Sequence, residues 1–222
     1  DRFGYIYTSG TTGLPKAAII TNQRVVGPGA LLGRGVFAMT EDDVLYLTTP
    51  LYHSVGMYVG WSSALTTGAT LALRRRFSAS SFWQDVRRFQ ATVFVYIGEL
   101  CRYLLNQPPQ PAEREHSLRL AGGNGLRPDI WAEFQDRFQI PLIREYYGAT
   151  EGASMCVNMV GKPGMVGRLT PGNAILRCDV ETGEPWRGAD GFCQALGPGR
   201  FPVERKGQGP GLKLRVIGFA QV

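Results

Sequence analysis

Histidine and closely spaced cysteine are scarce in this sequence. Only two histidines and four cysteines occur in 222 residues, and no two cysteines lie two to four residues apart, the spacing of a zinc knuckle. The scattered cysteines favour reduced thiols over a disulfide framework. We therefore expect neither a structural metal site nor disulfide bonds.

Long hydrophobic runs are also missing. The longest apolar stretches, such as residues 92–98, fall far short of the roughly 20 residues that a membrane-spanning helix needs. The first residues, 1–7, read as a strand and not as a signal peptide. We therefore expect this chain by itself to be soluble.

Charge is sparse and dispersed. Charged residues make up 19% of the chain, and 24 basic residues against 18 acidic ones give a net charge of +6. A basic balance raises nucleic acid as a partner, but the basic groups, such as residues 74–76 and 87–88, are not interleaved with aromatics. We predict no nucleic-acid binding; salt-sensitive binding to duplex DNA would contradict this. Residues 74–76 fit a solvated face, with a membrane surface or a CoA phosphate as the alternative.

The remaining pattern is that of an α/β protein. Apolar strand-like runs alternate with helical stretches, and Phe82, Val86 and Phe89 share one face of a helix. Such alternation predicts right-handed βαβ crossovers and a mainly parallel sheet. The predicted strands are 4–8, 44–48, 69–73, 92–97, 118–121 and 140–143, and the predicted helices are 56–67, 78–90, 99–106 and one that starts at Pro128.

Glycine disturbs this pattern in two places. Residues 22–36 stand where an α/β domain needs a helix, but five glycines and prolines there weaken one. From residue 197 to 211 glycine and proline recur without periodicity, which is typical of loop or disorder. We therefore predict one partial domain over 1–195 and a basic, disordered tail over 196–222.

The strongest chemical signal is a loop rich in glycine and hydroxyls that follows the first strand. Glycines let the backbone approach a ligand, and hydroxyls, free amides and a lysine can bind phosphate oxygens. The spacing is not that of a Walker A loop. An ordinary polar turn is the alternative, and the closing lysine favours phosphate binding. The loop residues are Thr8, Ser9, Gly10, Thr11, Thr12, Gly13 and Lys16.

The string YTSGTTGLPK at residues 7–16 resembles the phosphate-binding loop of the adenylate-forming enzyme superfamily. Further segments resemble one branch of it, the fatty acid transport proteins or very long-chain acyl-CoA synthetases, and they follow in that family's order. These segments are Pro50-Leu51-Tyr52-His53, FSAS at 77–80, YIGELCRYL at 96–104, GNGLRP at 123–128 and YGATEG at 147–152.

The resemblance implies a role for each matching residue. The loop would close over the β- and γ-phosphates of ATP, the Tyr147 ring would stack on adenine, and Thr150 would contact the α-phosphate. Glu151 would hold Mg²⁺, for which a carboxylate is a suitable hard ligand. Lys16, Thr150 and Glu151 would thus be catalytic, and Gly123, Asn124 and Gly125 would line the adenine and acyl pocket. For His53, an acyl-pocket role and a packing role both remain open.

The resemblance further implies the parallel βαβ portion of the large N-terminal domain, present incompletely. Its reaction would convert a long- or very-long-chain fatty acid, ATP and CoA into acyl-AMP and then acyl-CoA. The family implies membrane association through other segments, at the endoplasmic reticulum or plasma membrane, with these motifs on the cytosolic side. No ribose aspartate motif, hinge or lid lysine matches here. The alternative is therefore a catalytically incomplete fragment that binds nucleotide or regulates the complete enzyme.

Overall fold

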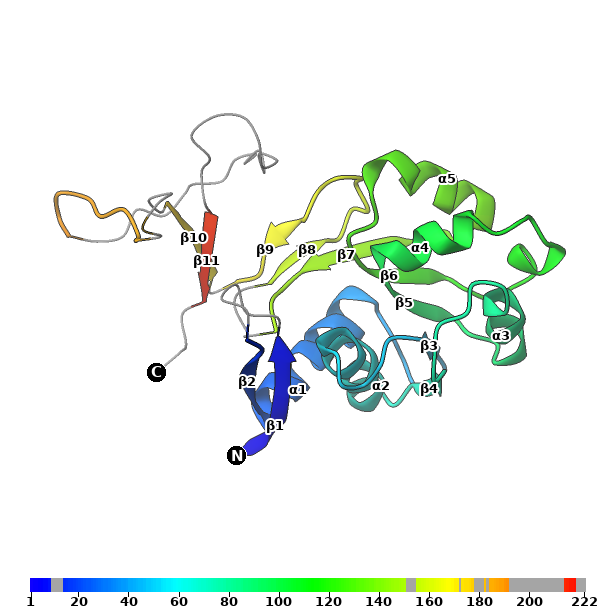
Figure 1. Cartoon of the computed structure of the whole chain (residues 1–222), viewed down its shortest axis with the longest axis horizontal. Coiled ribbons are helices and arrows are strands. Elements are labelled where there is room, and N and C mark those ends of the chain that lie inside the picture. Colours follow the sequence, from blue (N-terminus) through cyan, green and yellow to red (C-terminus); the bar gives the residue numbers. More distant parts are fainter. Residues whose placement is uncertain are drawn as a thin grey trace.

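The structure is a computed structural model, and it describes residues 1–8, 14–150, 155–171, 182 and 184–191, together with the backbone of 173–177 and 214–218. It confirms the predicted α/β class. Helices lie on both faces of a seven-stranded sheet, and two separate two-stranded sheets, β1-β2 and β10-β11, complete the described strands (Figure 1).

The central sheet is mostly parallel. Its spatial order is β4-β3-β5-β6-β7-β8-β9, and β4 to β7 run parallel while β8 and β9 join antiparallel. Each connection between parallel strands therefore runs back from the carboxyl end of one strand to the amino end of the next. The strands are β3 Val44–Leu47, β4 Thr70–Leu73, β5 Val93–Ile97, β6 Leu120–Asn124, β7 Ile143–Tyr147, β8 Cys156–Asn158 and β9 Arg168–Leu169.

Strand β5 shows why the sheet is covered on both faces. Phe94 and Tyr96 belong to one buried cluster and Val93 and Val95 to another, because successive side chains of a strand point to opposite faces. A strand buried on both faces reads as a continuous apolar run, and residues 92–97 are such a run.

One apolar layer is formed by α3 (Phe82–Arg88), α4 (Gly98–Leu105) and α5 (Pro128–Phe138). The other is formed by two π-helical segments, Leu31–Val36 and Val55–Trp61, and α1 (Asn22–Ala30) and α2 (Ser62–Thr67) pack against these segments. Figure 1 shows α4 and α5 on one side of the sheet and α1 and α2 on the other. In the part of the chain described, no helix is long and apolar enough to cross a membrane.

The glycine-rich segment 22–36 is helical, contrary to its weak helix propensity. Thr21 caps α1, because its hydroxyl accepts a hydrogen bond from the Arg24 N–H at 3.3 Å. A Cβ at Gly29 would overlap Ser62, and one at Gly33 would press on Ser63. The glycines thus permit a close approach between this segment and α2, and that packing outweighs their propensity cost.

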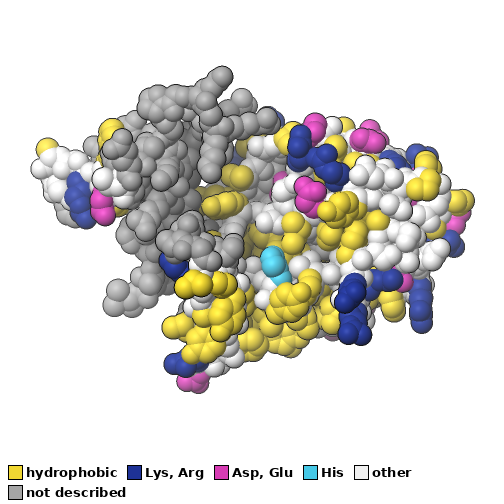
Figure 2. Space-filling model, viewed as in Figure 1, with side chains coloured by type: hydrophobic (Ala, Val, Ile, Leu, Met, Phe, Trp, Pro, Cys, Tyr) yellow, Lys and Arg dark blue, Asp and Glu magenta, His cyan; other side chains and the backbone are white. Residues whose placement is uncertain are grey.

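A hairpin precedes α1. Strand β1 (Arg2–Thr8) pairs antiparallel with β2 (Lys16–Thr21), and Thr8 lies opposite Lys16. The sequence predicted β1 but not β2. Figure 2 shows hydrophobic side chains gathered over this hairpin, since its outer face carries the exposed Phe3, Tyr5 and Tyr7.

Two strands begin and end later than the predicted ranges 118–121 and 140–143. Strand β6 continues to Asn124 and β7 to Tyr147. The glycines of β6 fit their neighbours tightly, because a Cβ at Gly122 would overlap the Phe37 ring and one at Gly123 would overlap Tyr96. The low strand propensity of glycine therefore predicts an end of β6 that is too early, because it ignores this packing.

The tail also departs from the prediction of no ordered elements after residue 196. Strand β11 (Leu214–Gly218) pairs antiparallel with β10 (Asn173–Arg177). Residues 214–218 include the apolar Leu214, Val216 and Ile217, two of them β-branched, a strand signal that the surrounding glycines and prolines obscured. The structure therefore describes five residues of the predicted tail as a strand.

Candidate functional site

The predicted site residues gather at one edge of the central sheet. In a parallel sheet the carboxyl ends of neighbouring strands meet at the same edge, and ligands bind there. Asn124 ends β6, Tyr147 ends β7, and the turn with His53 follows β3. Three of the motifs found in the sequence therefore end on this edge, which we call the carboxyl edge.

Thr150 ties this edge together. Its hydroxyl donates a hydrogen bond to Oγ of Ser54 at 3.0 Å. Ser54 follows β3 and Thr150 follows β7, so the contact joins segments 96 residues apart. The contact therefore holds the Thr150 hydroxyl between the ends of two strands.

Arg24 connects the hairpin to Thr150. Its guanidinium donates to the carbonyl of Thr150 at 3.2 Å and to the carbonyl of Ile19, on β2, at 2.9 Å. The hairpin that carries the glycine-rich loop is thereby fixed beside the segment after β7. Arg24 was not predicted from the sequence. A cation in the first turn of a helix opposes the helix dipole, and that unfavourable placement was the available signal.

The turn after β6 is held by close backbone contacts. Gly125 has φ of +83°, a left-handed conformation that favours glycine. A Cβ at Gly98, where α4 begins, would overlap the Gly125 carbonyl oxygen. The start of α4 and the turn after β6 therefore touch through backbone alone.

The buried carboxylate of Glu145 also holds the turn after β6. Oε1 of Glu145, on β7, accepts a hydrogen bond from the Leu126 N–H at 2.7 Å and one from the Tyr96 hydroxyl at 3.2 Å. Glu145 is 8% exposed. Burial raises its pKa above the usual value, and these hydrogen bonds offset only part of that. Glu145 was not predicted from the sequence, although a carboxylate next to two tyrosines at a strand end was a visible signal.

Tyr147 and Asn124 are left open to a partner. The Tyr147 ring is 48% exposed at the end of β7. Oδ1 of Asn124 is buried, and no described residue donates to it. A buried acceptor without a donor costs free energy, so this atom suits a ligand that brings an N–H or O–H group.

The glycine-rich loop is described only at its ends. Ser9, Gly10, Thr11, Thr12 and Gly13 lie outside the described residues. The Thr8 hydroxyl donates to the Lys16 carbonyl at 3.5 Å, and the Lys16 side chain is exposed. The loop therefore closes a hairpin, with the lysine directly after it.

The predicted magnesium ligand, Glu151, also lies outside the described residues. Among the residues that are described, no three His, Cys, Asp or Glu side chains form a group that would hold a metal. The predicted site residues that the structure does describe are Thr8, Lys16, Gly123, Asn124, Gly125, Tyr147 and Thr150.

His53 has a local structural role. Its ring Nδ1 accepts a hydrogen bond from the backbone N–H of Val55 at 3.1 Å. The backbone N–H of His53 donates to the Pro50 carbonyl at 3.0 Å. Partial burial lowers its pKa, which favours the neutral ring. These contacts support the packing role by starting the helical segment 55–61.

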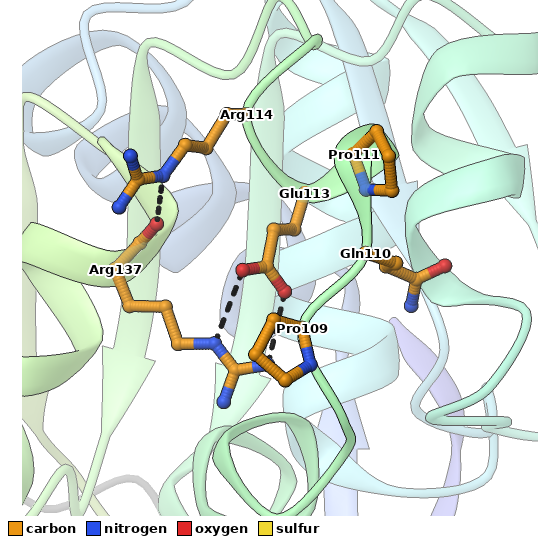
Figure 3. A pocket seen from close by; sticks show the side chains of 6 residues that line it. All are labelled: Pro109, Gln110, Pro111, Glu113, Arg114 and Arg137. Atoms are coloured by element: carbon orange, nitrogen blue, oxygen red, sulfur yellow. Dashed lines mark hydrogen bonds and ion pairs between the residues drawn. The ribbon is translucent and has the colours of Figure 1, made fainter.

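Another pocket, of about 420 Å³, is lined by an arginine, Arg137, together with the carboxylate that neutralises it, Glu113 (Figure 3). Arg137 pairs with the buried Glu113 at 2.9 Å and donates to the carbonyls of Leu105 and Gln107. Figure 3 shows both partners pointing toward each other across the pocket. The guanidinium is already used, so this cluster stabilises the fold and offers no free charge.

Comparisons with known proteins agree with this geometry. The AMP-binding enzyme family matches residues 1–195. The chain is 45% identical to long-chain fatty acid transport protein 6 of Mus musculus over 95% of the chain and 33% of that protein. It is 47% identical to long-chain fatty acid transport protein 1 of Homo sapiens over 95% of the chain and 34% of that protein.

A bacterial relative is similar to the same degree. The medium/long-chain-fatty-acid–CoA ligase FadD6 of Mycobacterium tuberculosis is 46% identical over 100% of the chain and 36% of that protein. The chain thus spans about a third of the length of these relatives.

Solved structures show the same fold. The ATP-bound MatB of Rhodopseudomonas palustris matches with a TM-score of 0.67 at 27% identity, over 83% of this chain and 37% of that one. A benzoate CoA ligase from Burkholderia xenovorans LB400 matches with a TM-score of 0.71 at 21% identity, over 90% of this chain and 39% of that one.

Proposed function

Because this chain belongs to the AMP-binding enzyme family, we propose that it takes part in the ATP-dependent activation of a long- or very-long-chain fatty acid. The product would be acyl-AMP and then, with CoA, acyl-CoA. The names of the relatives, long-chain fatty acid transport proteins and a fatty-acid–CoA ligase, support this substrate class.

The described residues fit the nucleotide at several points. The exposed Tyr147 ring offers a flat face to adenine, and the Asn124 Oδ1 accepts from its amino group. The backbone of Gly123 and Gly125 lies beside them. The Thr150 hydroxyl can turn from Ser54 to donate to the α-phosphate.

The glycine-rich loop completes the proposed phosphate site. Ser9, Gly10, Thr11, Thr12 and Gly13 would surround the β- and γ-phosphates together with Thr8, and Lys16 would neutralise their charge. Glu151 would hold Mg²⁺, which lowers the cost of developing charge on pyrophosphate. Such fixed charges act by electrostatic stabilisation.

The observation that carries the proposal is the double hydrogen bonding of Arg24. It joins β2, which leaves the glycine-rich loop, to Thr150, which follows the adenine-stacking Tyr147. Phosphate-binding and base-binding segments that are more than 120 residues apart are thereby brought to one edge. An ordinary polar turn would not need this link.

We further propose membrane association for the protein in which these motifs act, at the endoplasmic reticulum or plasma membrane with the motifs on the cytosolic side. The transport-protein names of the relatives support it. The described part of this chain contributes no spanning helix, so the association would come from a surface or from other segments.

The first experiment measures thermal unfolding of the purified chain by circular dichroism, with and without saturating MgATP. A ligand that binds only the native state raises the melting temperature, so we expect an upward shift. Lys16→Ala should reduce this shift, whereas Lys162→Ala, an exposed lysine outside the proposed site, should not.

Acyl-AMP formation is then assayed with a long-chain fatty acid. Lys16→Ala should raise the activation free energy of acyl-AMP formation by about 3 kcal/mol, which slows the reaction roughly a hundredfold. A nucleotide-dependent shift without any acyl-AMP would favour the alternative, a nucleotide-binding fragment. A broad transition that ignores MgATP would refute nucleotide binding by this chain.

A further inference from the structure

Strand β4 forms one edge of the central sheet. It lies beside β3 (Figure 1), and among the described strands it has no second neighbour. The N–H groups of Thr70 and Arg74 donate to backbone carbonyls on the β3 side at 2.9 and 3.0 Å. Because successive residues of a strand direct their backbone groups to opposite sides, the N–H and C=O groups of Leu71 and Leu73 point away from β3.

These outward backbone groups are available for pairing. In the part of the chain that the structure describes, no hydrogen bond reaches the N–H or C=O of Leu71 or Leu73 on this side. The Leu73 side chain is 47% exposed, and that of Leu71 is partly buried. A row of open N–H and C=O groups is a template for a strand from another chain.

The carboxyl end of this edge is basic. Arg75 and Arg76 follow β4 directly and are exposed, and the ion pairs found among the described residues include neither of them. Arg74 differs, because its guanidinium pairs with Asp85. The two later arginines therefore leave positive charge uncompensated where β4 ends.

The amino end of the edge is acidic. A Cβ at Gly68, just before β4, would lie 3.5 Å from the Cβ of Glu41, so the turn before β3 lies beside the start of β4. Glu41 and Asp42 are exposed in that turn. Arg34 also reaches this end, where it donates to the Thr66 carbonyl. Two carboxylates against one guanidinium leave this end negative.

Opposite charges at the two ends of one strand fit an antiparallel copy of the same strand. A two-fold axis at Ala72 sets Leu71 opposite Leu73 of the second copy, and each such pair exchanges two backbone hydrogen bonds. In this register Arg75 lies opposite Ala69 of the second copy, next to its acidic end. A parallel alignment would instead set arginines against arginines, which is unfavourable.

We propose that β4 is the docking edge for β4 of a second copy of this chain, so that one sheet continues through both copies. The pairing covers the exposed Leu73 side chain and brings Arg75 and Arg76 of each copy to Glu41 and Asp42 of the other. The inference goes beyond the proposed function, because none of the residues assigned to ATP lies on β4.

Sedimentation velocity of the purified chain, at concentrations from about 1 to about 500 µM, tests the association. The edge is only four residues long, and small interfaces are weak, so we expect a monomer–dimer equilibrium with a dissociation constant of roughly 100 µM. A short edge flanked by charge is otherwise a protection against pairing, and a monomer at every concentration would establish that alternative and overturn the proposal.

A charge exchange tests the orientation. Arg75→Glu with Arg76→Glu sets like charges together in the dimer, as does Glu41→Arg with Asp42→Arg, so each double variant alone should dimerise at least tenfold more weakly than the parent chain. An equal mixture of the two double variants restores opposite charges at both ends and should dimerise about as well as the parent. Lys162→Glu, at an exposed lysine away from β4, should leave dimerisation unchanged.

Amide hydrogen exchange, measured by NMR at about 50 and about 500 µM, identifies the surface. The N–H groups of Leu71 and Leu73 should exchange roughly twofold or more slowly at the higher concentration, because the dimer protects them. Those of Thr70 and Arg74 are bonded on the β3 side and provide the internal control, with the same protection at both concentrations.

A dimer that leaves Leu71 and Leu73 in equally fast exchange at both concentrations uses another surface and overturns the proposal. Full dimerisation of either double charge variant alone, or failure of their mixture to associate, overturns the antiparallel register. The MgATP shift of the parent chain is measured separately, and its loss would refute only the nucleotide function.

Discussion

The two ends of the central strands differ in whether their buried polar groups are paired by hydrogen bonds. At the amino ends of β3, β5 and β6, the polar residues Asp43, Thr92 and Arg119 bond with one another. At the carboxyl ends of β3 and β6, polar atoms of Thr48, Thr49 and Asn124 are buried without a described partner. The same strands thus end in a closed network on one side and in unpaired groups on the other.

The closed network is centred on Asp43. Its carboxylate accepts from the Thr92 hydroxyl at 2.6 Å, from the Thr40 N–H at 2.9 Å, and from Arg119 at 2.9 and 2.7 Å. Arg119 also donates to the Phe37 carbonyl at 3.1 Å. Burial alone would raise the pKa of Asp43, but the bonds from Arg119 and Thr92 outweigh it and lower the pKa.

This difference separates stability from function along a single strand. Bonds made within the protein hold the strands in register, whereas unpaired groups leave hydrogen bonds available for a ligand. Substitutions at the amino ends should therefore change the free energy of unfolding, and those at the carboxyl ends should change binding.

The largest expected effect is at the amino ends. Asp43→Ala leaves Arg119 and the Thr92 hydroxyl without their partner, and should lower the free energy of unfolding by about 3 kcal/mol. Urea denaturation measures this, with Asp42→Asn, an exposed neighbouring aspartate, as control. The folded variant should keep the affinity of the parent chain for MgATP; weaker nucleotide binding would break the proposed division between the two ends.

Gly98→Ala tests the carboxyl edge with a smaller expected loss of stability. The new Cβ overlaps the Gly125 carbonyl, so the turn after β6 must shift, at a cost of about 2 kcal/mol. The MgATP-induced rise in melting temperature should shrink as well. Gly4→Ala is the matched control, because nothing lies within 4 Å of a Cβ there; an unshifted turn would give the two variants the same MgATP response.

Glu145→Ala should cost about 1.5 kcal/mol, because the Leu126 N–H and the Tyr96 hydroxyl lose their acceptor. It should also weaken MgATP binding through the turn after β6. Glu145→Gln retains an acceptor oxygen and should restore most of both quantities. If glutamine fails to restore binding, the negative charge itself matters and the carboxylate is more than a positioning group.

The smallest effect is a pH dependence. The pKa of Asp43 is lower in the folded chain than its ordinary value of 3.8, so its stabilisation is complete above that value and is lost as the pH falls through the folded pKa. Urea midpoints measured from pH 7 to pH 3 should therefore drop more steeply for the parent chain than for Asp43→Ala. Parallel curves would show that Asp43 ionises alike in both states.

The sequence predicted the elements whose signals are local. The helix from Pro128 buries Trp131, Phe134 and Phe138, as their spacing indicates, and the apolar run 92–97 is a central strand. The segments that resemble the family contain Tyr147 and Asn124, and the structure places both at the ends of strands on the carboxyl edge.

Long-range contacts were not predictable in the same way. Arg24 acts through Thr150, 126 residues away, and Glu145 acts through Leu126 and Tyr96. No periodicity encodes such pairs. Strand β2 was missed because Lys16–Thr21 follows the loop directly and forms strand only by pairing with β1.

The contact between α1 with its π-helical extension and α2 has an evolutionary consequence. At Gly29 and Gly33 no side chain fits without displacing α2, whereas a Cβ at Gly27 meets nothing within 4 Å. Close-packed interiors tolerate little added volume. Among natural variants of this chain, substitutions should therefore accumulate at position 27 and be rare at positions 29 and 33, although all three glycines look alike in the sequence.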